Sequence, residues 1–249
     1  MKYLTTDELL RKNKEEAHGI LENCTGKSVR DNFAIKIFAK YLADSFGADK
    51  TIRILDLAPA SGGFVKQASS VGYNNIAGVD LDDYLQDNNR DLFKEFKTAD
   101  LSWRPIPWSD QFFDVVTAWC VLPHLENPFH CIREVHRTLN KNGLFIFTAP
   151  YLASKPSTDY FVKYKDFGSY RSSNNHLVLF PGGVVAKSVL RYFELVNIEY
   201  HFRTKIFYKG LRGRLRRMIY NISKSISLSL SKKLAQRWAY NIVYILRKK

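Results

Sequence analysis

The stretch Ile-Leu-Asp-Leu-Ala-Pro-Ala-Ser-Gly-Gly-Phe, residues 54–64, decides the fold. It passes from an apolar segment that suits a buried strand into an acid, Asp56, then into a turn of small residues and a helix-like segment. Such a turn needs small residues because the backbone changes direction sharply and lies close to a bound ligand. The stretch therefore predicts a strand, a turn and a helix, with a ligand at the carboxyl end of the strand.

Two more acids end predicted strands. Asp80 ends the apolar segment 75–80, where a carboxylate can accept both hydroxyls of a ribose. Asp100 ends the segment 96–100, where it is placed to meet an adenine amino group. Because parallel strands end at one edge of a sheet, these acids and the small-residue turn predict an adenosine site at that edge.

The remaining chain alternates between strand-like and helix-like patterns. We expect strands at 52–57, 75–80, 96–100, 113–119, 144–149, 194–202 and 241–246, and helices at 62–71, 81–92, 128–139 and 182–192. The pattern predicts an α/β fold: a Rossmann-like, doubly wound, mostly parallel seven-stranded sheet with an antiparallel last strand, N-terminal helices and a helical insertion before the last strand.

One domain over residues 1–249 is the expected organisation. Two N-terminal helices are expected, one opened by the capping-box spacing of Thr5 and Glu8 and one at 31–46. The expected parts are the N-terminal helices at 1–50, a Rossmann-like core at 51–202 with an irregular substrate loop at 151–175, a basic amphipathic insertion at 203–240 and the last strand at 241–249.

The motifs together resemble the class I S-adenosylmethionine-dependent methyltransferase superfamily, whose first motif is Asp/Glu-x-Gly-x-Gly-x-Gly. The resemblance covers about residues 50–150 and is carried by the segments 54–64, 76–80, 105–116, 124–128 and 133–143. It implies a methyltransferase that uses S-adenosylmethionine. The fingerprint Gly-x-Gly-x-x-Gly is absent, which argues against a dinucleotide dehydrogenase.

The resemblance also implies which residues bind the cofactor. Asp56 and the turn with Ala58, Ala60 and Gly62 would hold the methionine part, Asp80 with Leu81 the ribose, and Asp100 with Leu101 the adenine; Trp119 is a further candidate. Ala58 and Ala60 replace two glycines of the motif and add methyl groups beside the expected cofactor, and Pro59 removes a backbone donor. A fold that no longer binds the cofactor is the alternative interpretation.

An oxygen acceptor usually needs a base within hydrogen-bond reach. His124 is the first candidate because it follows the fourth strand at the edge where the methyl group should point, as in many members of the superfamily. His176 is the second, because it follows the predicted substrate loop. A hydrogen-bonded structural role is the alternative for either histidine, and His130 and His136 are expected to be surface or packing residues.

Two other types of methyltransferase fit less well. The segment 118–122 lacks the Asn/Asp-Pro-Pro-Tyr motif of amino-methylating enzymes, which argues against methylation of DNA bases. The turn at 56–64 is similar to that of ribosomal RNA 2′-O-methyltransferases of the heat-shock type, but their Asp-x-x-Pro signature after the fourth strand is absent.

The net charge of +14 is confined to the end of the chain, since residues 200–249 contain 14 basic residues and no acid. Within 211–238, apolar residues recur at the spacing of one helical face. A cationic amphipathic helix with a tryptophan is typical of an interfacial membrane segment. The alternatives are a nucleic acid partner, packing of the apolar face on the domain, and a solvated tail that aids solubility; the alternation at 226–231 would also fit a strand.

These features predict where the protein acts. The N-terminus turns acidic at once without the apolar stretch of a signal peptide, so we expect a cytoplasmic protein with reduced thiols, able to bind the inner membrane face. Cys120 and Cys131 are expected in the core, and the cysteines lack metal-ligand spacing.

The predicted reaction is O-methylation of a glycan or lipid-linked intermediate at the cytoplasmic membrane face. The loop with His176 is similar to that of bacterial methyltransferases found with surface-polysaccharide synthesis. The alternatives are a quinone or other lipid methyltransferase, an RNA methyltransferase and a catalytically silent interaction module.

Overall fold

A computed structural model describes part of the chain. The described residues are 8, 11, 14, 15, 33–171, 175–201, 215, 218, 219, 222 and 228–249. The helix expected to start at Thr5 and much of the basic insertion at 203–240, including Arg212, Arg216 and Arg217, therefore lie outside the described residues.

Seven strands form one sheet in the order β3-β2-β1-β4-β5-β7-β6. The strands are β1 Ile54–Leu57, β2 Ile76–Asp80, β3 Glu95–Thr98, β4 Phe113–Ala118, β5 Leu139–Pro150, β6 Phe193–His201 and β7 Asn241–Lys248. β1 to β5 pair in parallel, and β7 runs antiparallel to both β5 and β6. This arrangement confirms the predicted fold class and the antiparallel last strand.

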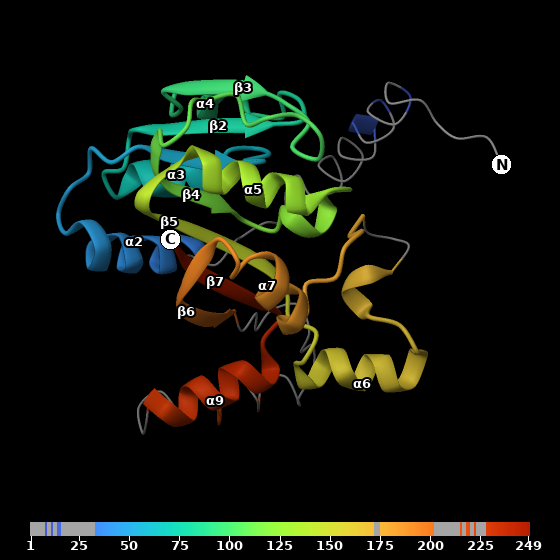
Figure 1. Cartoon of the computed structure of the whole chain (residues 1–249). Coiled ribbons are helices and arrows are strands. Elements are labelled where there is room, and N and C mark those ends of the chain that lie inside the picture. Colours follow the sequence, from blue (N-terminus) through green and yellow to red (C-terminus); the bar gives the residue numbers. More distant parts are fainter. Residues whose placement is uncertain are drawn as a thin grey trace.

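Helices cover both faces of the sheet, as Figure 1 shows. α2 Phe33–Phe46 and α3 Gly63–Ser70 pack with Ile54 and Ile76 on one face. On the other face, α5 Pro128–Thr138 and α7 Gly182–Ser188 pack with Leu55 and Val79. Successive strand residues point to opposite faces, so both faces of these strands are apolar and buried.

The carboxyl ends of β1 to β5 share one edge of the sheet. The first residue of β7, Asn241, pairs with the last residue of β5, Pro150, and therefore lies at the same edge. The helix α6, Lys155–Tyr164, follows β5, and α9, Leu228–Trp238, precedes β7. These two helices contact each other at this end of the sheet (Figure 1).

The irregular loop predicted at 151–175 was wrong in part, because this segment contains α6 and the short helix η2, Gly168–Tyr170. The helix α6 starts at a cap in which the Ser154 side chain accepts from the amide of Ser157. None of its side chains is buried, so the helix contributes nothing to the core.

The helix predicted at 81–92 was also too long, since α4 spans only Asp87–Arg90. The carboxylates of Asp82 and Asp83 accept from nearby backbone amides and so compete with helical hydrogen bonds. Several strand limits differ as well: β1 begins two residues later than predicted, β3 ends before Asp100, β5 begins five residues earlier, at Leu139, and β7 ends two residues later. The segment 228–231 is helical, which excludes a strand there.

Gly78 in β2 tests the packing beneath the site. A Cβ at this position would lie 2.6 Å from Cε1 of Phe93, so Gly78→Ala should lower the free energy of unfolding by about 1–3 kcal/mol through overpacking. Gly183 in α7 has open space around it, so Gly183→Ala should leave the protein equally stable or about 1 kcal/mol more stable. Urea unfolding measures both; equal effects would show that the close packing of β2 on Phe93 is wrong.

Candidate functional site

The turn between β1 and α3 has a left-handed backbone at three positions. The φ angles are +46° at Ala58, +51° at Ala60 and +79° at Gly62. Alanine in this region costs about 1–2 kcal/mol, a cost that the glycines of the family motif avoid. Gly62 is required for a second reason, because a Cβ there would lie 2.9 Å from the Cβ of Asn89. The turn therefore keeps the shape of the motif although two glycines are replaced.

Asp80 is held beside this turn. Its carboxylate accepts hydrogen bonds from the backbone amides of Ala60, at 3.0 Å, and Leu81, at 2.7 Å. The side chain is buried, and burial raises the pKa of the carboxyl to about 6 although both amides favour the charged form. A carboxylate fixed in this way has lone pairs left for hydroxyl donors.

The two other strand-end acids lie on either side of Asp80. Asp56 is buried in β1, where its Oδ1 accepts from the Thr117 hydroxyl at 2.6 Å. Asp100 lies two residues past β3 and accepts from the amide of Ser102 at 2.9 Å, beside the buried Leu101. Since β1, β2 and β3 are neighbours, the structure brings all three acids to one edge.

Two buried polar atoms near this edge have no hydrogen-bond partner among the described residues. They are Oδ1 of Asn89 and Nε1 of Trp119. Asn89 donates through Nδ2 to the carbonyl of Ser61 in the turn, and the Trp119 ring packs on Phe64 of α3 at 5.1 Å between ring centroids. Buried polar atoms are nearly always paired in folded proteins. The site therefore fits a ligand that has both donors and acceptors, as the ribose and adenine of S-adenosylmethionine do.

Asn89 is a site residue that the sequence analysis missed. It lies in a polar stretch, and no spacing or motif distinguished it from its neighbours. Its position over the turn results from the short helix α4, which the pattern at 81–92 did not delimit.

The two candidate bases lie against each other. The ring centroids of His124 and His176 are 4.4 Å apart. Nδ1 of His124 lies 3.2 Å from the carbonyl oxygen of Asn175, and Nδ1 of His176 bonds the carbonyl oxygen of Ser169. A carbonyl can only accept, so each Nδ1 carries the proton and each Nε2 keeps a lone pair.

Backbone contacts hold the two histidines together. His124 ends the short helix η1, Leu122–His124, directly after β4. The amides of Leu177 and Val178, next to His176, both donate to the carbonyl of Pro123. The segment that begins at Asn175 is thereby tied to the end of β4.

Burial keeps the histidine pair neutral. Burial, together with the adjacent His176, lowers the pKa of His124 to about 4. Burial also lowers the pKa of His176 from its ordinary value. At neutral pH both imidazoles are uncharged, so each Nε2 keeps a lone pair for a bound hydroxyl group, although the same burial makes both weaker bases than a free imidazole.

Cys120 was wrongly predicted in the core. It is exposed at the end of β4, and its φ of +61° turns the chain out of the sheet. Its backbone amide donates to the Thr148 hydroxyl at 2.7 Å. Cys131 is fully buried in α5, as predicted. His130 and His136 contact a surface carbonyl and two aromatic rings, respectively, away from the pair.

A protein-family model described as a methyltransferase domain matches residues 55–147. Residues 55–147 therefore form a methyltransferase domain, and the strand order supports the resemblance to the class I superfamily. The domain carries the turn, the three acids and His124, whereas His176 and the basic segment lie beyond the matched residues. S-adenosylmethionine is the methyl donor that this superfamily implies, and the site residues above fit it.

Known proteins share parts of the chain. Cycloartenol-C-24-methyltransferase 1 of Oryza sativa subsp. japonica is 25% identical over 128 residues, which cover 48% of this chain and 36% of that protein. The match thus spans only about a third of the length of this curated relative.

Solved structures share the fold. In the complex of the Haloferax volcanii Trm112 methyltransferase activator with a methyltransferase, the matched chain is 13% identical, with a TM-score of 0.63 and coverage of 94% of this chain and 96% of that one. The [4+2]-cyclase SpnF is 15% identical, with a TM-score of 0.61 and coverage of 100% and 97%. At these identities the likeness concerns the fold alone.

Asp80 provides a test of the cofactor site. A hydroxyl donor is held best by the ionised carboxylate, so affinity for S-adenosylmethionine should fall as the pH is lowered through about 6. Asp80→Asn should bind roughly ten to a hundredfold more weakly at pH 8, since a hydrogen bond to a charged group contributes about 1.5–3 kcal/mol. Its affinity should also lose the pH dependence. Calorimetric titration from pH 5 to 8 measures both effects.

The matched control is Asp44→Asn, which removes an exposed carboxylate from α2. It should bind S-adenosylmethionine as the wild type does. Wild-type affinity in Asp80→Asn would remove Asp80 from the site.

Proposed function

We propose that this chain transfers the methyl group of S-adenosylmethionine to an oxygen atom of a glycan or lipid-linked acceptor at an anionic membrane surface, on the cytoplasmic side. The observation that carries the O-methylation is the pair of neutral imidazoles, 4.4 Å apart, beside the cofactor edge of the sheet. S-adenosylmethionine supplies a methyl group on a positively charged sulfur. The protein has to orient the acceptor, exclude water and take up the hydroxyl proton.

The roles of the site residues follow from their contacts. Asp80, Asn89 and Trp119 bind and orient the cofactor, and Asp56 keeps the end of β1 in place through Thr117. Nε2 of His124 or His176 accepts the acceptor's proton, while the carbonyls of Asn175 and Ser169 fix the tautomer of the pair. All of these groups lie at the carboxyl edge of the sheet.

The exposed apolar face of the basic segment supports the membrane part of the proposal. Leu215, Met218 and Ile222 are helical and are 50%, 53% and 49% exposed. Such exposure does not favour internal packing of this part of the face, whereas Leu234 and Trp238, farther along it, are half-buried. The surrounding residues 200–249 contain only basic charges, which complement anionic headgroups. Within the described residues, no helix is long and apolar enough to cross a membrane.

A lipid acceptor gains support from the similar plant protein, whose name specifies cycloartenol as its substrate. A quinone or other lipid is therefore the second candidate. An RNA 2′-O-methyltransferase and a catalytically silent interaction module remain alternatives. Cofactor binding and liposome binding separate these functions.

The histidine pair can be tested by methyl transfer from labelled S-adenosylmethionine to membrane glycolipid fractions. His124→Ala and His176→Ala should each lower turnover by roughly a hundredfold or more while leaving cofactor affinity unchanged. The double variant should be about as slow as the slower single variant, because the two imidazoles act as one unit. His130→Ala is the control, since this imidazole bonds the surface carbonyl of Arg104. Full activity of both single variants would exclude a base role for the pair.

Sedimentation with liposomes tests membrane binding. The protein should sediment with vesicles of phosphatidylglycerol and phosphatidylcholine and much less with phosphatidylcholine alone, since each cation near an anionic surface contributes about 1 kcal/mol. The triple variant Lys232→Gln, Lys233→Gln and Arg237→Gln removes three exposed charges from α9 and should bind roughly a hundredfold or more weakly.

The control is the triple variant Lys36→Gln, Lys66→Gln and Lys94→Gln, which makes the same change of charge elsewhere on the surface. It should sediment as the wild type does. Equal loss in both triple variants would mean that net charge, rather than the basic segment, controls binding. Binding to RNA with steep salt dependence and without liposome binding would favour the RNA alternative.

A further inference from the structure

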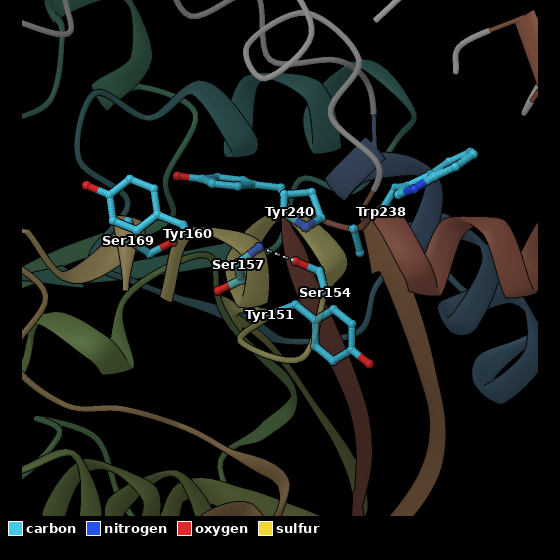
Figure 2. A pocket seen from close by; sticks show the side chains of 10 residues that line it. Tyr151, Ser154, Ser157, Tyr160, Ser169, Trp238 and Tyr240 are labelled. Atoms are coloured by element: carbon cyan, nitrogen blue, oxygen red, sulfur yellow. Dashed lines mark hydrogen bonds between the residues drawn. The ribbon is translucent and has the colours of Figure 1, made fainter. Parts of the chain in front are cut away.

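A cavity of about 120 Å³ lies at the end of β5, outside the residues assigned above to the cofactor. Its walls come from the segment after β5, from α6, from η2 and from the junction of α9 with β7, as Figure 2 shows. The side chains that matter below are Tyr151, Ser157, Tyr160, Ser169, Trp238 and Tyr240. None of the described residues that line the cavity is charged.

The walls are tied to the sheet rather than to a free loop. The amide of Tyr151 donates to the carbonyl of Tyr240 at 2.9 Å and continues the pairing of β5 with β7. Ser154 caps α6 by accepting from the amide of Ser157, the hydrogen bond dashed in Figure 2. The cavity is therefore largely preformed, which is usual for ligand sites.

The cavity shares a wall with the histidine pair. Ser169 lines the cavity, and its carbonyl oxygen accepts from Nδ1 of His176. The next residue, Tyr170, packs its ring against His176 with centroids 5.2 Å apart. The short helix η2 thus contributes to the wall of the cavity and contacts His176, so the cavity adjoins the histidine pair.

We propose that this cavity is the acceptor site and that it holds an uncharged ring carrying hydroxyl groups, of about the size of one six-membered ring. The proposal rests on the proposed methyl transfer and specifies its substrate class. Aromatic side chains offer flat apolar faces to a ring, and serine and tyrosine hydroxyls pair with ring hydroxyls. A cavity of roughly 150 Å³ in another protein holds one benzene molecule, so a volume of about 120 Å³ admits no more than a single ring.

The lining also discriminates between acceptors. Without a lysine or arginine among the described lining residues, a phosphate or carboxylate placed in the cavity would lose its hydration without gaining a partner of opposite charge. A sugar ring and a quinol ring share the required chemistry. Both can form the polar end of an amphiphile.

The cavity and the basic segment meet at Trp238. This residue ends α9, the described helix of that segment, and also lines the cavity. A membrane that contacts α9 would lie close to the mouth of the acceptor site. A ring attached to a lipid could then enter the cavity while its chain stays in the bilayer.

Saturation-transfer NMR on the protein with bound S-adenosylhomocysteine tests the proposal. The probes are methyl α-D-glucopyranoside and 2-methylhydroquinone as uncharged rings, and glucose 6-phosphate as the charged comparison. At least one uncharged probe should bind, and glucose 6-phosphate should not. Binding of the glucoside alone identifies a sugar acceptor, and binding of the hydroquinone alone identifies a quinol.

Variants locate the bound probe. Ser157→Phe fills the cavity and Tyr160→Ala removes one aromatic wall, so each should weaken probe binding about tenfold or more. Val162→Phe, at an exposed position of the same helix, should bind like the wild type. If Ser157→Phe does not fold, Tyr160→Ala still decides the result.

The proposal is overturned if neither uncharged probe binds, if glucose 6-phosphate binds equally well, or if Ser157→Phe and Tyr160→Ala bind like the wild type. Calorimetry with S-adenosylmethionine on the same proteins separates the two proposals. If the wild type binds the cofactor but none of the uncharged probes, the acceptor site alone is contradicted, whereas absent cofactor binding in the wild type contradicts the methyl transfer.

Discussion

The left-handed turn after β1 is the constraint on which the site depends. It directs the amide of Ala58 to the carbonyl of Val79, at 2.7 Å, and the amide of Ala60 to the carboxylate of Asp80. These bonds join the ends of β1 and β2. The bond from Ala60 also favours the charged form of the Asp80 carboxylate, whereas burial raises its pKa. The strain of two alanines at positive φ is the cost of keeping this geometry without the usual glycines.

A second set of backbone bonds positions the acceptor side. The Pro123 carbonyl accepts from the amides of Leu177 and Val178 and so fastens the segment with His176 over the end of β4. The carbonyls of Asn175 and Ser169 then fix the tautomers of the histidine pair. The imidazoles are therefore oriented by main-chain atoms, which do not depend on the rotamers of other side chains.

The sequence predicted the elements that bury apolar residues, and it failed for a helix that buries none. The core strands and α5 have apolar faces that the pattern reveals, but α6 has no buried side chain and was predicted as a loop. Asp82 and Asp83 shortened a helix that apolar spacing alone would extend. The strand-end acids could be predicted because topology places them, whereas the cavity joins residues near 151–169 to residues 238–240, and no local pattern connects those.

The strand order explains how the two halves of the site meet. In the sheet, β2 and β3 lie on one side of β1, and β4, β5 and β7 lie on the other. Ligands of such sheets bind where the strand order reverses. The acids lie on the first side, and the uncharged aromatic cavity lies at the end of β5 on the second. His124 follows β4, which pairs with β1, so it stands at the boundary between them. In the proposed arrangement the acids hold the cationic donor, the tyrosines hold the neutral ring, and the neutral imidazoles lie at the boundary between them. The acids favour the positively charged ligand and the uncharged cavity favours the neutral one, so each ligand binds on its own side.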